Sequence, residues 1–257
     1  MCKTCGCEEA DLPAEAAHHH EHGHAPDHDH RQGTGQGGRI LKLERAVLAK
    51  NDELAEQNRA WLAGRRVVAL NLLSAPGAGK TALLERTLRD LRGEFPIHVI
   101  EGDQATDHDA RRIQDAGGRV VQINTGAGCH LDAAMVARAL EELDPPPGSV
   151  LFIENVGNLV CPALFDLGER AKVVVCSVTE GDDKPAKYPH VFRASSLLLL
   201  NKIDLLPYVP FDAERCLQFA RQANASLQVV RLSAARGDGL ADWYAWLREQ
   251  AALSDRR

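Results

Sequence analysis

A glycine-rich stretch at residues 74–81, with the sequence SAPGAGKT, has the residue types needed to bind the phosphates of a nucleotide. An apolar run precedes it and a helix-like run follows it, and a phosphate-binding loop requires this context of strand, turn and helix. Backbone N–H groups of the turn would point at the phosphates, where the dipole of the following helix adds positive potential. The turn residues concerned are Gly77, Ala78 and Gly79.

Two side chains at the end of this stretch would make the charged contacts. Lys80 would reach the β- and γ-phosphates, and the hydroxyl of Thr81 would bind Mg²⁺. The motif usually begins with glycine, and Ser74 occupies that position here. A chance turn between a strand and a helix is the alternative, but the intact Gly-Lys-Thr end favours a nucleotide site.

A second motif, Asn-Lys-Ile-Asp, follows a run of leucines and predicts that the base is guanine. The carboxylate of Asp204 can accept from the N1–H and the 2-amino group of guanine, a donor pair that adenine lacks. Asn201 would hydrogen-bond locally, and the stem of Lys202 would cover the purine face. Backbone N–H groups of Ser233 and Ala234 could meet the guanine oxygen. An ordinary strand-to-loop turn is the alternative, but together with the phosphate loop the motif indicates GTP and GDP.

Carboxylates follow two other predicted strands. Asp103 is nearest to its strand end and is the favoured Mg²⁺ ligand, directly or through water. Asp107 comes next, although it could instead cap the following helix. Glu154 opens a Glu-x-x-Gly segment in which Gly157 would donate its N–H to the γ-phosphate and move when that phosphate leaves. The predicted catalytic residues are Lys80, Thr81, Asp103 and Glu154.

Two thiols and an imidazole could form a metal site beside the nucleotide. Cys129 and His130 follow the third predicted strand, and Cys161 follows the fourth by a short loop. Both loops lie at the carboxyl edge of the predicted sheet, so the three side chains can converge, and such a set suits Ni²⁺ or Zn²⁺. Ordinary buried cysteines are the equal alternative at this stage. Cys176 and Cys216 are interpreted as packing residues.

The first 39 residues have almost no large apolar side chains, which predicts a disordered tail. It carries two groups of potential metal ligands, Cys2, Cys5, Cys7 and His18, His19, His20, His22, His24, His28, His30. We expect the thiols to bind metal rather than to act as a redox pair, because no thioredoxin-like unit follows. The histidines are interleaved with acids and are expected to buffer metal, with a polar linker or a purification tag as alternatives.

The remaining composition predicts an α/β protein. Apolar runs alternate with helical patterns, which indicates a P-loop fold with a mostly parallel, doubly wound sheet covered on both faces. The predicted strands are 67–73, 97–101, 119–123, 150–154, 172–177, 197–201 and 228–232, and the predicted helices are 80–92, 107–117, 130–143, 211–223 and 239–251. We expect a tail at 1–39, a helical lead-in at 40–65 and a nucleotide-binding domain at 66–257. The segment 181–189 reads as an exposed loop of no assigned role.

The net charge and the cysteines indicate which partners and which cellular compartment to expect. The net charge of −6 gives no reason to expect a nucleic acid or a membrane surface as partner. No apolar run is long enough to span a bilayer, and there is no signal-peptide pattern. Seven cysteines without a secretory signal indicate a reducing compartment, so we expect a cytoplasmic protein.

These motifs together resemble the nickel-insertion GTPases of NiFe-hydrogenase maturation. The resemblance rests on the opening CxxCGC, the histidine tract, SAPGAGKT, EGDQATD, GCHL, ENVGNLVCP and NKxD, and it spans nearly the whole chain. It implies an Mg²⁺-dependent GTPase that forms a GTP-dependent homodimer, with metal held at the dimer interface by Cys129, His130 and Cys161. It also implies nickel delivery to the hydrogenase large-subunit precursor together with a partner nickel/zinc metallochaperone of the HypA type.

The spacing of the motifs suggests how such a protein would work. Only three residues separate Gly157 from Cys161, so a loop that responds to the γ-phosphate would move a metal ligand. We therefore expect nickel and GTP to affect each other's affinity reciprocally. Slow hydrolysis is expected because no arginine finger is evident. The alternatives are a sister metallochaperone GTPase for urease or a cobalamin enzyme, and a nickel-storage protein with a vestigial GTP site.

Overall fold

The computed structural model describes the backbone of residues 37–103, 107–126 and 128–254, with side chains between Arg45 and Leu253. Among these residues, no helix is both long and apolar enough to cross a bilayer. The tail ligands predicted from the sequence lie outside the described residues: Cys2, Cys5, Cys7, His18, His19, His20, His22, His24, His28 and His30.

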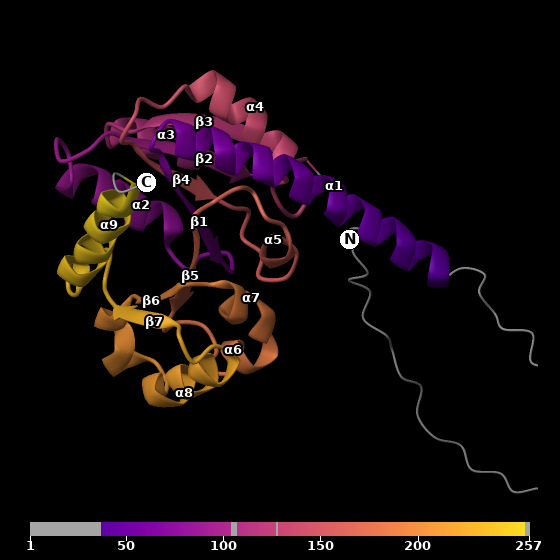
Figure 1. Cartoon of the computed structure of the whole chain (residues 1–257). Helices are drawn as coiled ribbons and strands as arrows, with labels where there is room; N and C mark the ends of the chain where they lie inside the picture. Colours follow the sequence, from indigo (N-terminus) through magenta and orange to yellow (C-terminus); the bar gives the residue numbers. More distant parts are fainter. Residues whose placement is uncertain (1–36, 104–106, 127, 255–257) are drawn as a thin grey trace, which may run out of the picture.

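Seven strands form one sheet in the order β3-β2-β4-β1-β5-β6-β7, and every neighbouring pair is parallel (Figure 1). The strands are β1 (Val68–Ser74), β2 (Ile97–Asp103), β3 (Arg119–Asn124), β4 (Val150–Glu154), β5 (Ala171–Ser177), β6 (Leu197–Asn201) and β7 (Gln228–Arg231). β1 lies at the centre and is buried along its whole length, as expected for a strand covered on both faces. All carboxyl ends therefore lie on one edge, where ligands of such sheets bind.

Helices cover both faces of the sheet. They are α1 (Gly37–Gly64), α2 (Lys80–Asp90), α3 (His108–Asp115), α4 (Ala133–Leu143), α5 (Cys161–Leu164), α6 (Lys184–Lys187), α7 (Pro189–Ala194), η1 (Ile203–Tyr208), α8 (Ala213–Ala223) and α9 (Leu240–Ser254). Side chains of α2, α3 and α9 share one apolar core with alternate residues of β1, including Leu70 and Leu72. α1 and α4 form a second core with residues of the opposite face, such as Ala69, and α5, α7 and α8 form a third.

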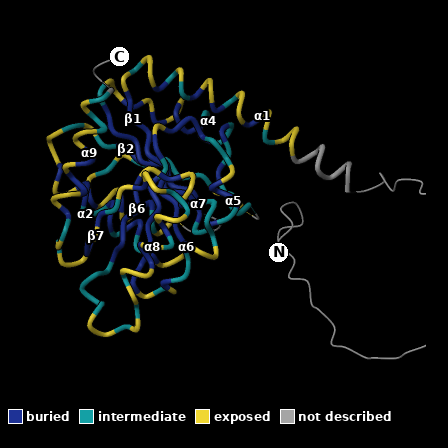
Figure 2. Tube along the Cα trace, turned by 60° about the horizontal axis from the view of Figure 1, so that its bottom comes forward, coloured by how far each residue is buried: buried dark blue, intermediate teal, exposed yellow. Residues whose placement is uncertain are grey.

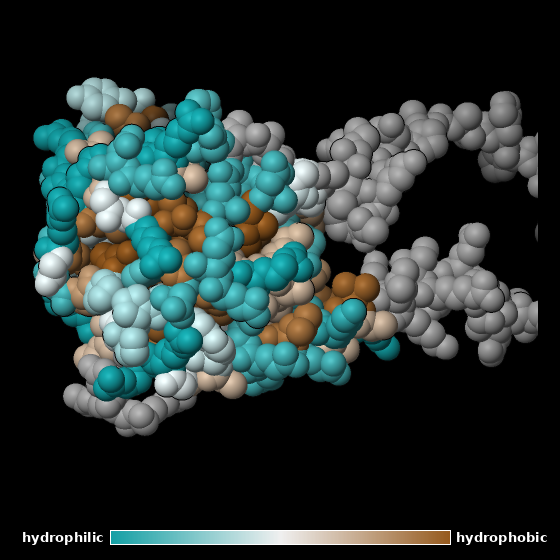
Figure 3. All heavy atoms as spheres, turned by 90° about the horizontal axis from the view of Figure 1, so that it is seen from above, coloured by the Kyte–Doolittle hydropathy of each residue, from teal (hydrophilic) through white to brown (hydrophobic). Residues whose placement is uncertain are grey.

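α1 is one continuous helix that packs beside α4, while its amino-terminal end projects from the body (Figure 1). Its inner face repeats at helical spacing, with Asn51, Ala55, Asn58 and Leu62 each at most 5% exposed. The outer face is exposed along the part of the helix from Arg45 to Gly64 (Figure 2). Seen from above, the surface is mostly hydrophilic, and hydrophobic residues show between hydrophilic ones near the middle of the view (Figure 3).

The predicted strands and long helices agree with the structure to within a few residues at their ends. The short elements α5, α6, α7 and η1 were not predicted, because so few residues show no periodicity. The prediction of an exposed loop at 181–189 is wrong. This segment contains α6 and the start of α7, and Asp182 and Pro185 are buried. Asp182 accepts from the backbone of Asp212 and from the side chain of Arg215, which holds the segment against α8.

Candidate nucleotide site and metal centre

The phosphate loop joins the central strand β1 to α2. Gly77 and Gly79 have φ values of 76° and 99°, a region that favours glycine. At Gly79 an added Cβ would also lie 2.6 Å from Nδ2 of Asn201, so the close approach of the two loops requires glycine there. α2 begins directly after this loop, and the N–H groups in the first turn of a helix can form an anion site.

The two side chains predicted to contact phosphate and Mg²⁺ are held by specific partners. Nζ of Lys80 donates to Oγ of Ser74 at 2.8 Å, so the residue that departs from the usual motif supports the lysine. Burial lowers the pKa of Lys80, and the nearby carboxylate of Glu154 acts in the opposite direction. The hydroxyl of Thr81 donates to Oε1 of Glu154 at 2.8 Å.

A cavity of about 430 Å³ lies against this loop and has an acidic side. Glu101, Asp103, Asp109 and Glu154 line it together with Lys80. Burial raises the pKa of Glu154, and burial with the neighbouring carboxylates raises the pKa of Glu101 to about 8. The Oε2 atoms of Glu101 and Glu154 are buried and have no hydrogen-bond partner among the described residues. Carboxylate oxygens beside a phosphate cradle fit Mg²⁺, which would neutralise phosphate charge when bound.

The cavity includes residues that the sequence did not single out. Glu101 and Asp109 were missed, although Glu101 belongs to the same acidic segment as Asp103. Asp107 is not among the lining residues. It occupies the N-cap position of α3 without a side-chain capping bond, and its carboxylate pairs with Arg111 at 2.5 Å.

The predicted guanine site lies beside the phosphate loop. Nδ2 of Asn201 donates to the carbonyl of Ala78 at 2.9 Å, and its Oδ1 accepts from the backbone N–H of Ala234 at 3.1 Å. Nζ of Lys202 donates to the carbonyl of Gly77 at 2.7 Å. Oδ1 of Asp204 is buried and has no partner among the described residues, which leaves this acceptor for a ligand. Asn201 thus ties together the phosphate loop and the loop that contains Ser233, whose side chain is fully buried.

Cys129, His130 and Cys161 converge, with one potential ligand atom from each and all three atoms within 4.8 Å of one another. Sγ of Cys129 lies 3.6 Å from Nδ1 of His130. Burial lowers the pKa of His130, which favours the neutral imidazole that a metal needs. The ring of Phe165 lies 4.0 Å from that of His130, centroid to centroid, and fixes its orientation.

The other two described cysteines are not part of this group. Cys176 and Cys216 are 4% and 1% exposed and belong to the apolar side of the fold around α8 and β5. Burial raises the pKa of both thiols, that of Cys216 to about 12, so neither forms a thiolate readily. Their interpretation as packing residues agrees with this placement.

One short segment connects the nucleotide cavity to the metal triad. Glu154 ends β4 at the phosphate loop, and Gly157 lies so close to Pro76 that an added Cβ would be 3.1 Å from it. Cys161 follows as the first residue of α5. The two candidate sites are therefore adjacent along the chain and in space.

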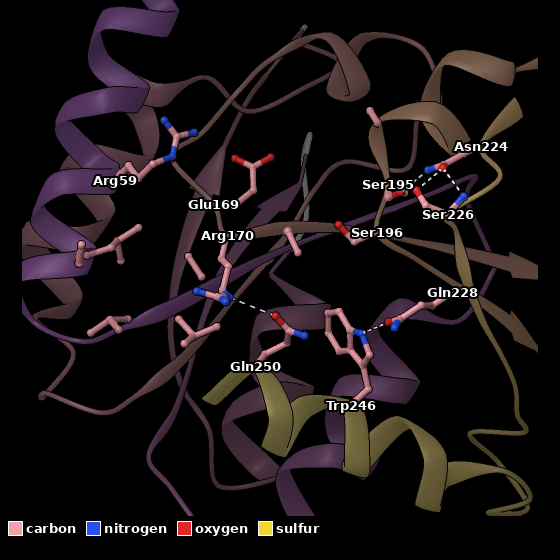
Figure 4. A pocket seen from close by; sticks show the side chains of 18 of the residues that line it. Arg59, Glu169, Arg170, Ser195, Ser196, Asn224, Ser226, Gln228, Trp246 and Gln250 are labelled. Atoms are coloured by element: carbon pink, nitrogen blue, oxygen red, sulfur yellow. Dashed lines mark hydrogen bonds between the residues drawn. The ribbon is translucent and has the colours of Figure 1, made fainter. Parts of the chain in front are cut away.

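A second cavity lies elsewhere. It measures about 730 Å³ and opens at the amino end of the strands, between α1 and α9 (Figure 4). Arg170 donates to Gln250 at 3.1 Å there, and Trp246 donates to Gln228 at 2.6 Å. No residue predicted from the sequence to bind nucleotide or metal lines this cavity.

Comparison with known proteins identifies relatives over most of the chain. Residues 68–231 match the family described as CobW/HypB/UreG, nucleotide-binding domain. The hydrogenase maturation factor HypB of Azotobacter vinelandii is 56% identical over 212 residues, which cover 82% of this chain and 70% of that protein. HypB of Escherichia coli strain K12 is 46% identical over 287 aligned positions, 97% of this chain and 99% of that protein.

Solved structures give the same result. Hydrogenase maturation factor HypB from Archaeoglobus fulgidus has a TM-score of 0.75 at 39% identity and covers 79% of this chain and 100% of its own. HypB from Helicobacter pylori, solved in complex with nickel, has a TM-score of 0.74 at 34% identity and covers 79% and 96%. The seven-stranded parallel fold predicted from the sequence is thus that of these proteins.

Proposed function

This chain belongs to the HypB family of hydrogenase maturation factors, and we propose that it couples a GTPase cycle to the movement of nickel through Cys129, His130 and Cys161. Its role is that of a nickel-delivering GTPase in hydrogenase maturation. The main support for this coupling is that one short segment, residues 154–161, belongs to both sites. Glu154 contacts the phosphate loop at one end, and Cys161 contributes to the metal triad at the other.

GTP would be bound by three groups of residues. Lys80 and the backbone of residues 77–81 would hold the phosphates, and Asp204 would accept from guanine. Mg²⁺ would be held by Thr81 and Asp103, with Glu154 oriented towards Thr81. Bound Mg²⁺ would neutralise charge that develops on the phosphates. No arginine from outside the chain is assumed, so slow turnover is expected.

Nickel is the cargo, and the triad suits it because two thiolates and a neutral imidazole favour late first-row metals. The same set would accept Zn²⁺. Three ligands from one chain leave further coordination positions for a second copy. Leu164, in the same short helix as Cys161, is 57% exposed and would become covered in such a dimer. We therefore propose a GTP-dependent homodimer with the triads near the two-fold axis.

The cycle would use the segment 154–161 as its moving part. The N–H of Gly157 would contact the γ-phosphate, and release of that phosphate would shift Cys161. The tail thiols and histidines would buffer nickel before it reaches the triad. The partners proposed are a HypA-type nickel/zinc metallochaperone and the hydrogenase large-subunit precursor.

A nickel titration in two nucleotide states tests this function. The chain to use is full length with Cys2, Cys5 and Cys7 replaced by serine, called here the serine-tail chain. In it, thiolate-to-nickel charge-transfer absorption reports on the core cysteines, whereas tail histidines contribute no such band. We expect nickel affinity to differ at least about 5-fold between GDP and a non-hydrolysable GTP analogue, and a dimer with the analogue.

Matched cysteine variants identify the site. Cys161→Ala should abolish most of the charge-transfer signal, whereas Cys216→Ala, which changes a buried cysteine outside the triad, should keep it. Equal nickel affinity in both nucleotide states and a monomer throughout would contradict the coupling and favour nickel storage.

A further inference from the structure

We propose that Leu131 is the positioning residue that transmits changes in the nucleotide cavity to Cys129 and His130, through its contacts with Asn155 and Gly102. This inference rests on the proposed coupling of nucleotide and nickel, and it adds a second route beside the segment that leads to Cys161. The first route moves one ligand, and the second would move the other two.

The first contact is made by the backbone. The N–H of Leu131, the residue directly after His130, donates to Oδ1 of Asn155 at 3.3 Å. Asn155 is 1% exposed, follows Glu154 at the end of β4, and lines the nucleotide cavity. The same Oδ1 accepts from the N–H of Val156 at 3.0 Å. One amide oxygen therefore joins the metal-binding loop to the start of the nucleotide-responsive segment.

The second contact is made by the side chain. Leu131 is fully buried and packs on Gly102, where an added Cβ would lie 2.9 Å from Cγ, Cδ1 and Cδ2 of the leucine. Gly102 precedes Asp103 on β2 and also lines the nucleotide cavity. Glycine is thus required at this position so that the leucine can reach the strand. Leu131 contacts two walls of the cavity without lining the cavity itself.

A buried polar network fixes the orientation of Asn155. Its Nδ2 donates to Oδ1 of Asn71 in the central strand at 3.3 Å, and Nδ2 of Asn71 donates to Oε1 of Glu169 at 3.1 Å. Glu169, labelled in Figure 4, also accepts from the backbone of Leu167 at 2.7 Å. Because its amide donates into this network, Asn155 must present its oxygen to Leu131.

The arrangement leaves little room for independent movement. A closely packed core passes displacements on to its neighbours, because it has no voids to absorb them. Asn155 and Gly102 hold Leu131 from two directions, and the next residue back along the chain is a metal ligand. A shift of residues 154–157 on loss of the γ-phosphate would therefore displace His130 relative to Cys161.

The test compares two buried leucines in the serine-tail chain. Leu131→Ala removes the side-chain atoms that pack on Gly102. Leu143→Ala truncates another fully buried leucine of the same apolar core, on α4. For each, nickel is titrated by its charge-transfer band with GDP and with the GTP analogue. Nucleotide affinity is then measured with and without nickel, since coupling must be reciprocal. GDP affinity without nickel serves as the check that the variant is folded.

We expect the at least 5-fold ratio of nickel affinities in the serine-tail chain to fall to within about 2-fold of unity in Leu131→Ala, and to persist in Leu143→Ala. A ratio in Leu131→Ala equal to that of the serine-tail chain overturns the inference while the proposed function stands. A ratio of unity in the serine-tail chain itself contradicts the proposed coupling and, with it, this inference.

A milder variant keeps the test decisive if Leu131→Ala does not fold. Truncation of a buried leucine to alanine leaves a cavity, whereas Leu131→Val retains the branched side chain and most of its volume. We expect Leu131→Val to give a ratio between unity and that of the serine-tail chain. An unchanged ratio in this folded variant would also overturn the inference.

Discussion

The hydroxyl of Thr81 donates to Oε1 of Glu154 at 2.8 Å, and this bond joins the phosphate loop to the end of β4. Oε2 of the same carboxylate is buried and has no partner among the described residues. Lys80, directly before Thr81, is close enough for Glu154 to favour its charged form against the effect of burial. The pair thus joins α2 to β4 beside the cavity and leaves one carboxylate oxygen without a partner among the described residues.

Replacing Glu154 with glutamine should impair hydrolysis more than binding. The amide keeps the size of the side chain but removes the charge that balances Lys80 and supports Thr81. Loss of one electrostatic group at a reacting centre typically costs about 100-fold or more in turnover. Phosphate release at saturating GTP and Mg²⁺ measures this, with GDP affinity expected within about 3-fold. Glu214→Gln, an exposed change near β7, is the control, and turnover in Glu154→Gln that matches it would refute the role.

Asp204→Asn should change the base that the protein prefers. Guanine offers two N–H donors to the carboxylate, whereas an amide can accept only one of them and places a donor against the other. Two hydrogen bonds to a charged group are worth about 1.5–3 kcal/mol each, so GDP affinity should fall about 100-fold or more. Xanthosine diphosphate, which has a carbonyl where guanine has its amino group, should bind the variant better than GDP does.

Competition binding with both nucleotides measures that preference. Asp212→Asn is the matched control, because Asp212 caps α8 and asparagine caps equally well. An Asp204→Asn protein that still prefers GDP would exclude Asp204 from guanine recognition.

The sequence could predict which candidate residues lie close together, because their positions follow from local motifs or from the common edge of parallel strands. Cys129 and Cys161 follow two parallel strands, and parallel strands end at the same edge of the sheet. Their proximity could therefore be predicted. The acidic residues were harder, because the order of carboxylates along the chain does not show which of them faces the cavity. Asp109, within α3, lines the cavity, whereas Asp107 pairs with Arg111.

Buried polar contacts between elements could not be predicted. Asn71 lies within an apolar strand, and nothing in its neighbours along the chain indicates a bond to Asn155 or Glu169. The role of α1 was missed for the same reason. Its Asn51 accepts from the N–H of Ala133, and its Asn58 donates to the carbonyls of Ala133 and Leu167. α1 therefore supports the turn at Ala133, beside the metal triad. The spacing of its apolar residues alone did not reveal this role.

Asn58→Ala should therefore weaken both the fold and the metal site. Two buried carbonyls would lose the hydrogen bond from Asn58, and that of Leu167 would be left without a donor, at a cost of about 1–3 kcal/mol of unfolding free energy. Urea denaturation measures this loss of stability. The same change in the serine-tail chain should lower its nickel affinity, because Ala133 and Leu167 lie close along the chain to His130 and Phe165, whose rings are in contact. Glu53→Ala, on the exposed side of the same helix, should change neither. Unchanged stability and nickel affinity in Asn58→Ala would show that α1 packs on the core without supporting the metal site.

His98 on β2 should make the protein less stable in mild acid. It is 7% exposed, its Nδ1 has no partner among the described residues, and burial with the nearby Arg119 lowers its pKa. As pH falls from about 7.5 to 5.5, the unfolded state takes up a proton at this residue before the folded state does. Unfolding free energy then decreases with falling pH, at most by about 1.4 kcal/mol per pH unit for one group.

The variant His98→Leu isolates this contribution, because the other histidines are common to both proteins and cancel in the comparison. Leucine fills the buried position without a titrating group, so its stability relative to the parent should rise steadily as the pH is lowered. Urea midpoints across that pH range, with a chelator to remove bound metal, give the difference. A difference that is constant from pH 7.5 to 5.5 would mean that His98 takes up its proton equally in the folded and unfolded states, and that burial in β2 does not control its charge.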